Sequence, residues 1–214
     1  MRVATTLSLI PAIMLVSCAD ADQQSANENG KTEATSSAKP MKSVVVKPIS
    51  EEDSIDAGLA VGKIAPLSVL FQTADGEQSL KSLLTDGPAV LIFTRSVSWC
   101  PFCQTQLKSI NTIQSELKTR GYQLYGISYD SPEEQERFSK NQMLDYMMLS
   151  DQKSAAIDAF GLRDPQYTEG RAVGVPYASV IIVDKHGKIL SKSVSGDYKK
   201  RPTNDQILAL VDAI

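Results

Sequence analysis

Histidine and cysteine are scarce in this chain: its 214 residues include one histidine and three cysteines. A protein zinc site needs about four ligands, drawn mainly from cysteine, histidine and carboxylate side chains. Outside Cys18, the thiol and imidazole ligands are limited to Cys100, Cys103 and His186. We therefore expect neither a zinc centre nor another resident metal or cofactor.

An excess of positive charge is missing as well. The formal net charge is −3 and the pI is about 5.3, and the only basic cluster is Lys199-Lys200-Arg201. This balance argues against nucleic acid as a partner, and the short cluster is typical of a solvated surface turn. Internal repeats and heptads are also absent, so we expect an ordinary globular domain.

The N-terminus carries the pattern of an export signal. Residues 1–18 place Arg2 before an apolar stretch that is too short and too interrupted to span a bilayer. Its end, Leu15-Val16-Ser17-Cys18, resembles the lipobox of bacterial lipoproteins. The resemblance implies that residues 1–17 are removed and that Cys18 is acylated, anchoring the protein in a membrane of the bacterial cell envelope so that it faces the periplasm. The alternative is an ordinary secretory signal with a chance cysteine.

A polar tether is expected to follow the signal. Residues 20–40 contain no large apolar side chain, so they cannot bury enough surface to offset the entropy of ordering. The run Val44-Val45-Val46 could add a short edge strand, but Pro48 and the acidic residues after it favour a linker. We therefore assign residues 18–55 to the tether and 56–214 to one domain.

Strand and helix patterns alternate along this domain. A continuous apolar run at 88–93 predicts a strand covered on both faces. Leu107, Ile110, Ile113 and Leu117 recur at helical spacing until Gly121. Further strands are predicted at 65–71, 77–80, 122–128, 146–150, 178–184 and 188–194. Further helices are predicted to start at Ser131, to cover 154–161, and to start at Thr203 and carry Ile207 and Val211. This order predicts an α/β fold, with a central mixed β-sheet and helices on both faces.

Two of the cysteines lie three residues apart in Ser98-Trp99-Cys100-Pro101-Phe102-Cys103, directly after the buried strand. Pro101 suits the first turn of a helix, which makes Cys100 the N-cap or its neighbour. Unpaired backbone N–H groups and the helix dipole there favour a thiolate, so the pKa of Cys100 should be lowered. Cys103 should be the more buried thiol, close enough to Cys100 for a disulfide.

Three roles are open to this cysteine pair. As a reversible dithiol, Cys100 attacks a substrate and Cys103 resolves the mixed disulfide. The second role is a purely structural disulfide. It is a poor explanation for this pair, because a bridge across two residues closes almost no loop and removes little entropy from the unfolded state. Copper delivery is the third role, implied by a resemblance to thioredoxin-fold copper carriers, which combine two cysteines with a distant histidine, here His186.

The motif Trp99-Cys100-Pro101-Phe102-Cys103 resembles the active site of the thioredoxin superfamily. The stretches at 61–66, 125–140, 148–162 and 174–189 are similar to the AhpC/TSA, or redoxin, branch, which includes the peroxiredoxins. The resemblance covers the whole domain and implies a thioredoxin-like fold. It also implies that Trp99, Pro101 and Phe102 shape the substrate groove.

Two positions depart from the patterns of these families. Peroxiredoxins carry Pro-x-x-x-Thr-x-x-Cys, where this chain has Phe93 and Val97, although Thr94 and Arg95 are near and could tune the thiolate. Thioredoxins place a cis-proline opposite the disulfide. Here that place falls to Ala178, or to Pro176 if the loop shifts and the Val175-Pro176 bond is cis.

The residues and the resemblance together predict a thiol-disulfide oxidoreductase with Cys100 as the nucleophile and Cys103 as the resolving thiol. Its partners would be protein thiols or disulfides, or a thioredoxin-like redox protein. The first alternative is a thioredoxin-like peroxidase that reduces hydroperoxides through a Cys100 sulfenic acid. The second is copper delivery. The direction of electron flow depends on buried contacts that a sequence does not display.

Overall fold

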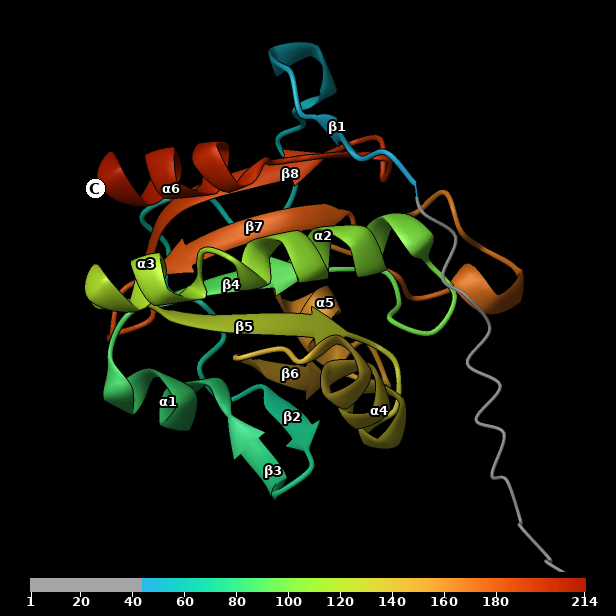
Figure 1. Ribbon diagram of the computed structural model, residues 1–214, viewed down its shortest axis with the longest axis horizontal. Coiled ribbons are helices and arrows are strands. Elements are labelled where there is room, and N and C mark those ends of the chain that lie inside the picture. The colour runs from blue at the N-terminus through green and yellow to red at the C-terminus, as the bar shows by residue number, and fades with distance from the viewer. Residues whose placement is uncertain (1–43) are drawn as a thin grey trace, which may run out of the picture. The chain divides into compact units, whose positions relative to one another are not determined.

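Residues 44–214 are described by a computed structural model of the chain (Figure 1). The predicted signal peptide at 1–17, Cys18 and the first part of the expected tether lie outside the described residues. None of the helices within residues 44–214 is both long and apolar enough to cross a membrane. The strands are β1 Lys47–Pro48, β2 Leu70–Thr73, β3 Gly76–Ser79, β4 Ala89–Phe93, β5 Gln123–Ser128, β6 Met147–Ser150, β7 Ala178–Val183, β8 Ile189–Ser195 and β9 Lys200–Arg201. The α-helices are α1 Leu80–Leu83, α2 Pro101–Asn111, α3 Gln114–Thr119, α4 Pro132–Gln142, α5 Ala155–Ala159 and α6 Asn204–Asp212.

Seven strands form the main sheet, in the order β3-β2-β6-β5-β4-β7-β8. The central strands β4, β5 and β6 are parallel, whereas β7 and β8 on one side and β2 and β3 on the other are antiparallel to their neighbours. The predicted mixed α/β sheet is therefore confirmed. Because β4 is an interior strand, next to the middle strand β5, its carboxyl end lies at the edge where α/β sheets usually carry their reactive groups.

Helices cover both faces of this sheet, as the apolar run of β4 requires. Leu91 and Phe93 point into one apolar core, with residues of α1 and α5, while Val90 and Ile92 point into the other, with residues of α2, α3, α4 and α6. In Figure 1, α2, α3 and α4 lie in front of the sheet and α5 lies behind it. All five residues of β4 are buried, which explains why the strand shows no polar alternation.

The helix after the cysteines is broken where we expected it to be continuous. The apolar spacing predicts one helix as far as Gly121, but α2 ends at Asn111 and α3 starts at Gln114. Between them the N–H of Ile113 donates to the Ile110 carbonyl at 3.1 Å, a tight three-residue closure. Ile113 is buried, so its side chain keeps the helical apolar spacing although the backbone changes direction.

The segment at 47–54, which we call the N-terminal strap, packs on the domain although we assigned it to the tether. Its strand β1 pairs in parallel with β9, and the N–H of Ile49 donates to the Arg201 carbonyl at 3.1 Å. Asp53 forms an ion pair with Lys200. These partners lie about 150 residues away along the chain, so local composition does not reveal the pairing, and Pro48 is tolerated because β1 is an edge strand.

The start of α4 provides a test of the fold. The Ser131 hydroxyl accepts the N–H of Glu134 at 3.2 Å, and the Glu134 carboxylate accepts the N–H of Ser131 at 3.1 Å. We expect Ser131→Ala to lower the free energy of unfolding by about 1 kcal/mol, because it leaves the Glu134 N–H without its cap. Urea denaturation measures the loss. Ser115→Ala, an exposed position in α3, is the matched control, and equal stabilities of the two variants would contradict the prediction.

Candidate active site

The two cysteines lie where β4 gives way to α2. The strand ends at Phe93, a loop runs through Trp99, and Cys100 is the N-cap residue of α2 with Pro101 in the first turn. The N–H of Cys103 donates to the Cys100 sulfur at 3.3 Å. A sulfur in this position accepts hydrogen bonds from backbone N–H groups and lies at the positive end of the helix dipole. Both interactions favour a thiolate on Cys100 after reduction.

Cys100 and Cys103 form a disulfide, with their Cα atoms 5.3 Å apart. We expected an exposed Cys100 and a covered Cys103, but both are buried, at 1% and 0% exposure. The bond joins Cys100 to a sulfur on the buried face of α2, so the residues that cover Cys103 also shield Cys100. Any partner must therefore first contact the residues around the disulfide.

A buried carboxylate holds the loop in front of Cys100. Asp130, which is 3% exposed, accepts the Ser96 hydroxyl at 2.6 Å and the Val97 N–H at 2.7 Å. The Ser96 oxygen in turn accepts the N–H groups of Ser98 at 2.9 Å and Trp99 at 3.2 Å. Burial raises the pKa of Asp130, although these donors oppose the rise. Sequence reasoning missed Asp130; its signal was an acidic residue just after the strand next to β4.

A buried guanidinium contacts the other sulfur. Arg201 is 0% exposed, and its Nη2 donates to the Cys103 sulfur at 3.2 Å. Its Nη1 donates to the Thr94 hydroxyl at 3.3 Å and to the Gln106 amide oxygen at 2.7 Å. The Tyr198 carbonyl accepts its Nε at 2.9 Å. In the disulfide form this cation therefore has only neutral acceptors, and reduction of Cys103 to a thiolate would give it a counter-charge.

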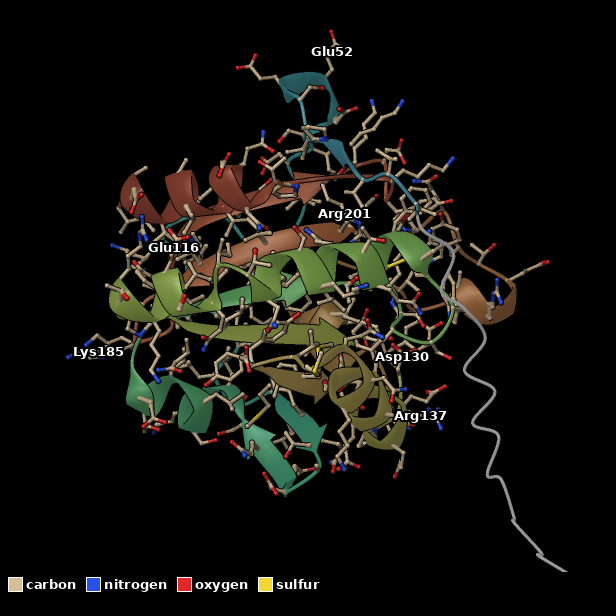
Figure 2. All side chains as sticks on the ribbon, in the orientation of Figure 1. Glu52, Glu116, Asp130, Arg137, Lys185 and Arg201 are labelled. Atoms are coloured by element: carbon tan, nitrogen blue, oxygen red, sulfur yellow. A yellow bond between two sulfur atoms is a disulfide. The ribbon has the colours of Figure 1, made fainter. Side chains whose placement is uncertain are left out.

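The pKa of Arg201 is lowered to about 9, mainly by burial and next by the positive charge of Arg95, while Asp197 acts in the opposite direction. Arg201 nevertheless remains largely charged at neutral pH. A positive charge next to a sulfur stabilises the thiolate and so lowers the pKa of the corresponding thiol. In Figure 2 the yellow sulfur–sulfur bond lies at the N-terminal end of α2, and Arg201 and Asp130 are labelled on opposite sides of that helix. The prediction that Arg201 belongs to a solvated surface turn is therefore wrong, because its side chain is fully buried.

A cavity of about 380 Å³ opens beside this guanidinium. It is lined by Gln106 and Arg201, by Val46 just before the N-terminal strap, and by Thr203 at the start of α6. Because Arg201 contacts both Gln106 and the Cys103 sulfur, the cavity borders the polar groups around that cysteine.

Aromatic rings surround Arg95, which we named as a possible thiolate-tuning residue. Arg95 is 5% exposed, and its guanidinium carbon lies 5.1, 4.4 and 4.0 Å from the ring centroids of Trp99, Tyr167 and Tyr198. Its Nε has no hydrogen-bond partner among the described residues. The Tyr198 ring also meets the Phe102 ring edge-on, with centroids 5.7 Å apart, which joins this group to the residues between the cysteines.

The other predicted site residues are Thr94, Trp99, Ala178 and Pro176. Thr94 meets Arg201 as described, and the Trp99 indole N–H donates to the Tyr129 hydroxyl at 2.9 Å. Ala178 is the first residue of β7 and pairs with Ser195, whereas Pro176 forms an isolated bridge with Arg163. A cis bond at Val175-Pro176 stays a prediction.

His186 lies at the other end of the sheet from the cysteines. The antiparallel register pairs Ser179 with Phe93 and Val183 with Ala89, so the turn after β7 that carries His186 lies near the start of β4. Across residues 44–214, no group of three or more His, Cys, Asp or Glu side chains gathers into a metal site. This placement separates the histidine of the copper hypothesis from both sulfurs.

A buried strand that runs into a Cys-x-x-Cys disulfide at a helix N-terminus, within a mixed sheet covered on both faces, defines a thioredoxin-like thiol oxidoreductase. A model of the AhpC/TSA family matches residues 61–192, which is more than half of the chain. The protein belongs to the AhpC/TSA family.

Relatives of known sequence agree with this membership, and solved structures share the fold. The chain is 31% identical to peroxiredoxin Bcp of Escherichia coli over 152 residues, covering 70% of this chain and 94% of the relative. It is 26% identical to a thiol peroxidase of Aquifex aeolicus, covering 70% and 85%. Among solved structures, Prx3 of Vibrio vulnificus has a TM-score of 0.64 at 20% identity, covering 72% and 99%. BcpB of Mycobacterium tuberculosis has a TM-score of 0.61 at 23% identity, covering 72% and 97%. The protein is a peroxiredoxin-like antioxidant oxidoreductase.

The Arg201 contact predicts a measurable thiol acidity. We expect Arg201→Gln to raise the pKa of the Cys103 thiol by about 1 unit or more, because the variant removes the opposite charge at 3.2 Å from the sulfur. Thiolate absorbance titrated against pH in a reduced Cys100→Ser background measures Cys103 alone. Arg120→Gln, which removes a surface arginine paired with Asp212, is the control. An unchanged pKa in a folded Arg201→Gln protein would show that the guanidinium does not act on this thiol.

Proposed function

We propose that the protein is a dithiol peroxidase, which reduces hydroperoxides and stores the oxidising equivalents as the Cys100–Cys103 disulfide. The observation that carries the proposal is this disulfide at the N-terminus of α2 in a member of the AhpC/TSA family. Relatives that bear the names peroxiredoxin and thiol peroxidase support it. They favour the peroxidase alternative over the general thiol-disulfide oxidoreductase that the motif first suggests.

The reaction needs no group beyond the two thiols and the peroxide. The Cys100 thiolate attacks one peroxide oxygen and the O–O bond breaks. The departing alkoxide, or hydroxide in the case of hydrogen peroxide, takes up a proton and leaves as an alcohol or as water. Cys100 is then a sulfenic acid. The Cys103 thiolate attacks its sulfur, hydroxide leaves and is protonated to water, and the disulfide forms. An external thiol, such as that of a thioredoxin-like protein, must later reduce it.

Each sulfur contacts a group that stabilises a thiolate. The Cys100 sulfur lies at the N-terminus of α2 and accepts the N–H of Cys103, while the Cys103 sulfur accepts a hydrogen bond from Arg201. Because both thiolates are stabilised, the reverse order, in which Cys103 attacks the peroxide and Cys100 resolves, is the alternative that the single-cysteine variants test. The Thr94 hydroxyl is bonded to the same guanidinium, and it lies three residues before Val97, which stands where the family pattern has its threonine.

Oxidation by peroxide is the direct test. The single tryptophan of the chain, Trp99, adjoins the disulfide, so its fluorescence in stopped flow should report disulfide formation. We expect hydrogen peroxide and an alkyl hydroperoxide to oxidise the reduced protein at least about 100-fold faster than free cysteine, because the site stabilises developing charge. Rates no faster than a free thiol's would remove the peroxidase proposal.

The single-cysteine variants Cys100→Ser and Cys103→Ser complete this experiment. The variant that still forms a sulfenic acid with peroxide, detected by mass spectrometry, retains the attacking sulfur. Peroxide-inert protein whose Cys103→Ser variant traps mixed disulfides with a model protein would instead support the general thiol-disulfide oxidoreductase.

We also propose that the protein is lipid-anchored at Cys18 and faces the periplasm, as its N-terminal motif suggests. Cys18→Ala should therefore move the protein from the membrane fraction to the soluble fraction of a bacterial expression host, because it removes the acylated residue. Fractionation with immunoblotting measures this, and mass spectrometry of the mature N-terminus identifies the lipid. Cys103→Ser, which leaves the lipobox intact, is the matched control. If the wild-type protein is cleaved and found in the soluble fraction, residues 1–17 are an ordinary secretory signal and the lipid anchor is wrong.

A further inference from the structure

Cations and aromatic rings alternate beside the disulfide. Arg171 lies 4.8 Å above the Trp99 ring, and Arg95 lies 5.1 Å from the same ring. Arg95 also lies 4.0 Å from the Tyr198 ring, and the Lys199 ammonium lies 5.6 Å from that ring. We call this run of Arg171, Trp99, Arg95, Tyr198 and Lys199 the cation–ring ladder. It assembles three cations in a protein whose formal net charge is −3.

Within the described part of the chain, these three cations have no carboxylate partner. None of the ion pairs formed within residues 44–214 includes Arg95, Arg171 or Lys199. Among the described residues, the Nε of Arg95 is buried without any acceptor. The acidic residue nearest to Lys199 in the sequence is Asp197, which accepts the backbone N–H of Lys199 at 3.0 Å and forms no ion pair with its ammonium. Glu169, two residues before Arg171, likewise appears in none of these ion pairs. Ring faces attract cations but leave their N–H donors free for an anion.

The ladder also lies on the approach to the disulfide. Both sulfurs are buried, whereas Trp99, Tyr198 and Phe102 are half-buried and Arg171 and Lys199 are exposed. Trp99 precedes Cys100 in sequence, and the Phe102 ring, between the two cysteines, meets the Tyr198 ring. A reductant must bring its own thiol to a sulfur of this pair, so it meets the ladder before it reacts.

We infer that the cation–ring ladder is the docking surface for an acidic redox protein, whose carboxylates beside its reactive cysteine bind the exposed Arg171 and Lys199, while the buried Arg95 adds positive charge between them. The inference rests on the proposed function, because it names the partner that closes the peroxidase cycle. Charge complementarity of this kind acts mainly on the rate of association and on the choice of partner. The free N–H donors of the guanidinium groups suit carboxylates in particular.

The reduction step is an ordinary thiol–disulfide exchange. A thiolate of the partner attacks one sulfur of the Cys100–Cys103 bond, that bond breaks, and the other sulfur leaves as a thiolate. The second thiol of the partner, once deprotonated, then attacks the mixed disulfide. Two electrons pass to this protein, and the partner becomes the disulfide. Of the two sulfurs, Cys103 is the better leaving group because Arg201 stabilises its thiolate.

Two synthetic dithiol peptides test the docking surface. They share a Cys-Gly-Pro-Cys core and differ only in flanking residues, which are glutamate in one and glutamine in the other. Trp99 fluorescence follows reduction of the oxidised full-length protein. We expect the glutamate peptide to react about tenfold faster at low ionic strength and about twofold faster in high salt, because salt screens the exposed charges.

Charge reversal supplies the matched variants. The double variant Arg171→Glu with Lys199→Glu should react more slowly with the glutamate peptide than with the glutamine peptide. The control, Arg137→Glu with Lys118→Glu, makes the same change of net charge at exposed positions of α4 and α3 and should retain the wild-type preference. Arg137 is labelled beside α4 in Figure 2.

The outcomes separate this inference from the proposed function. Equal rates with both peptides in all proteins, with peroxide oxidation intact, would overturn the docking surface and leave the peroxidase in place. Loss of peroxide oxidation itself would overturn the proposed function. If charge reversal abolished binding to phosphatidylglycerol vesicles and left the peptide rates unchanged, the ladder would be a lipid contact and the inference would be wrong.

Discussion

The hydrogen bonds accepted by the buried Asp130 carboxylate constrain the loop on which the active site depends. The chain leaves β4 fully buried and must turn within a few residues to start α2, so the loop's polar groups need partners inside the protein. Asp130 supplies them to Ser96 and Val97, and Ser96 extends the network to Trp99. Cys100 can cap α2 because the loop before it has a defined path.

The sequence correctly predicts the elements that depend on residues close together in the chain. Five consecutive apolar residues predicted β4, and serine, proline and glutamate predicted the start of α4. The same reasoning placed Cys100 at the start of a helix. It failed where the partner is distant: β1 forms only because β9 lies beside it, and Arg201 looked like a surface residue because Thr94, Gln106 and Cys103 are about 100 residues away.

Charge is distributed unevenly around the two sulfurs. Arg201 touches Cys103, Arg95 adds a second buried cation nearby, and the nearest buried carboxylate described above, that of Asp130, is engaged by the loop. Such surroundings stabilise thiolates relative to the neutral disulfide, which makes the disulfide easier to reduce. Val97 stands where the family pattern has a threonine, and the Thr94 hydroxyl, three residues earlier, accepts a hydrogen bond from the Arg201 guanidinium.

The Arg201 contact also links chemical reactivity to the progress of folding. Cys103 and Arg201 are separated by 98 positions, so the pair forms only when the C-terminal part of the chain has joined the sheet. Contacts of such long range carry a high loop-closure cost and belong to the slow, late part of assembly. Until then the thiols keep the ordinary acidity of unfolded cysteine, about pKa 8.5. A chain that is still unfolded is thus a weak nucleophile, and full reactivity toward oxidants develops only with the completed domain.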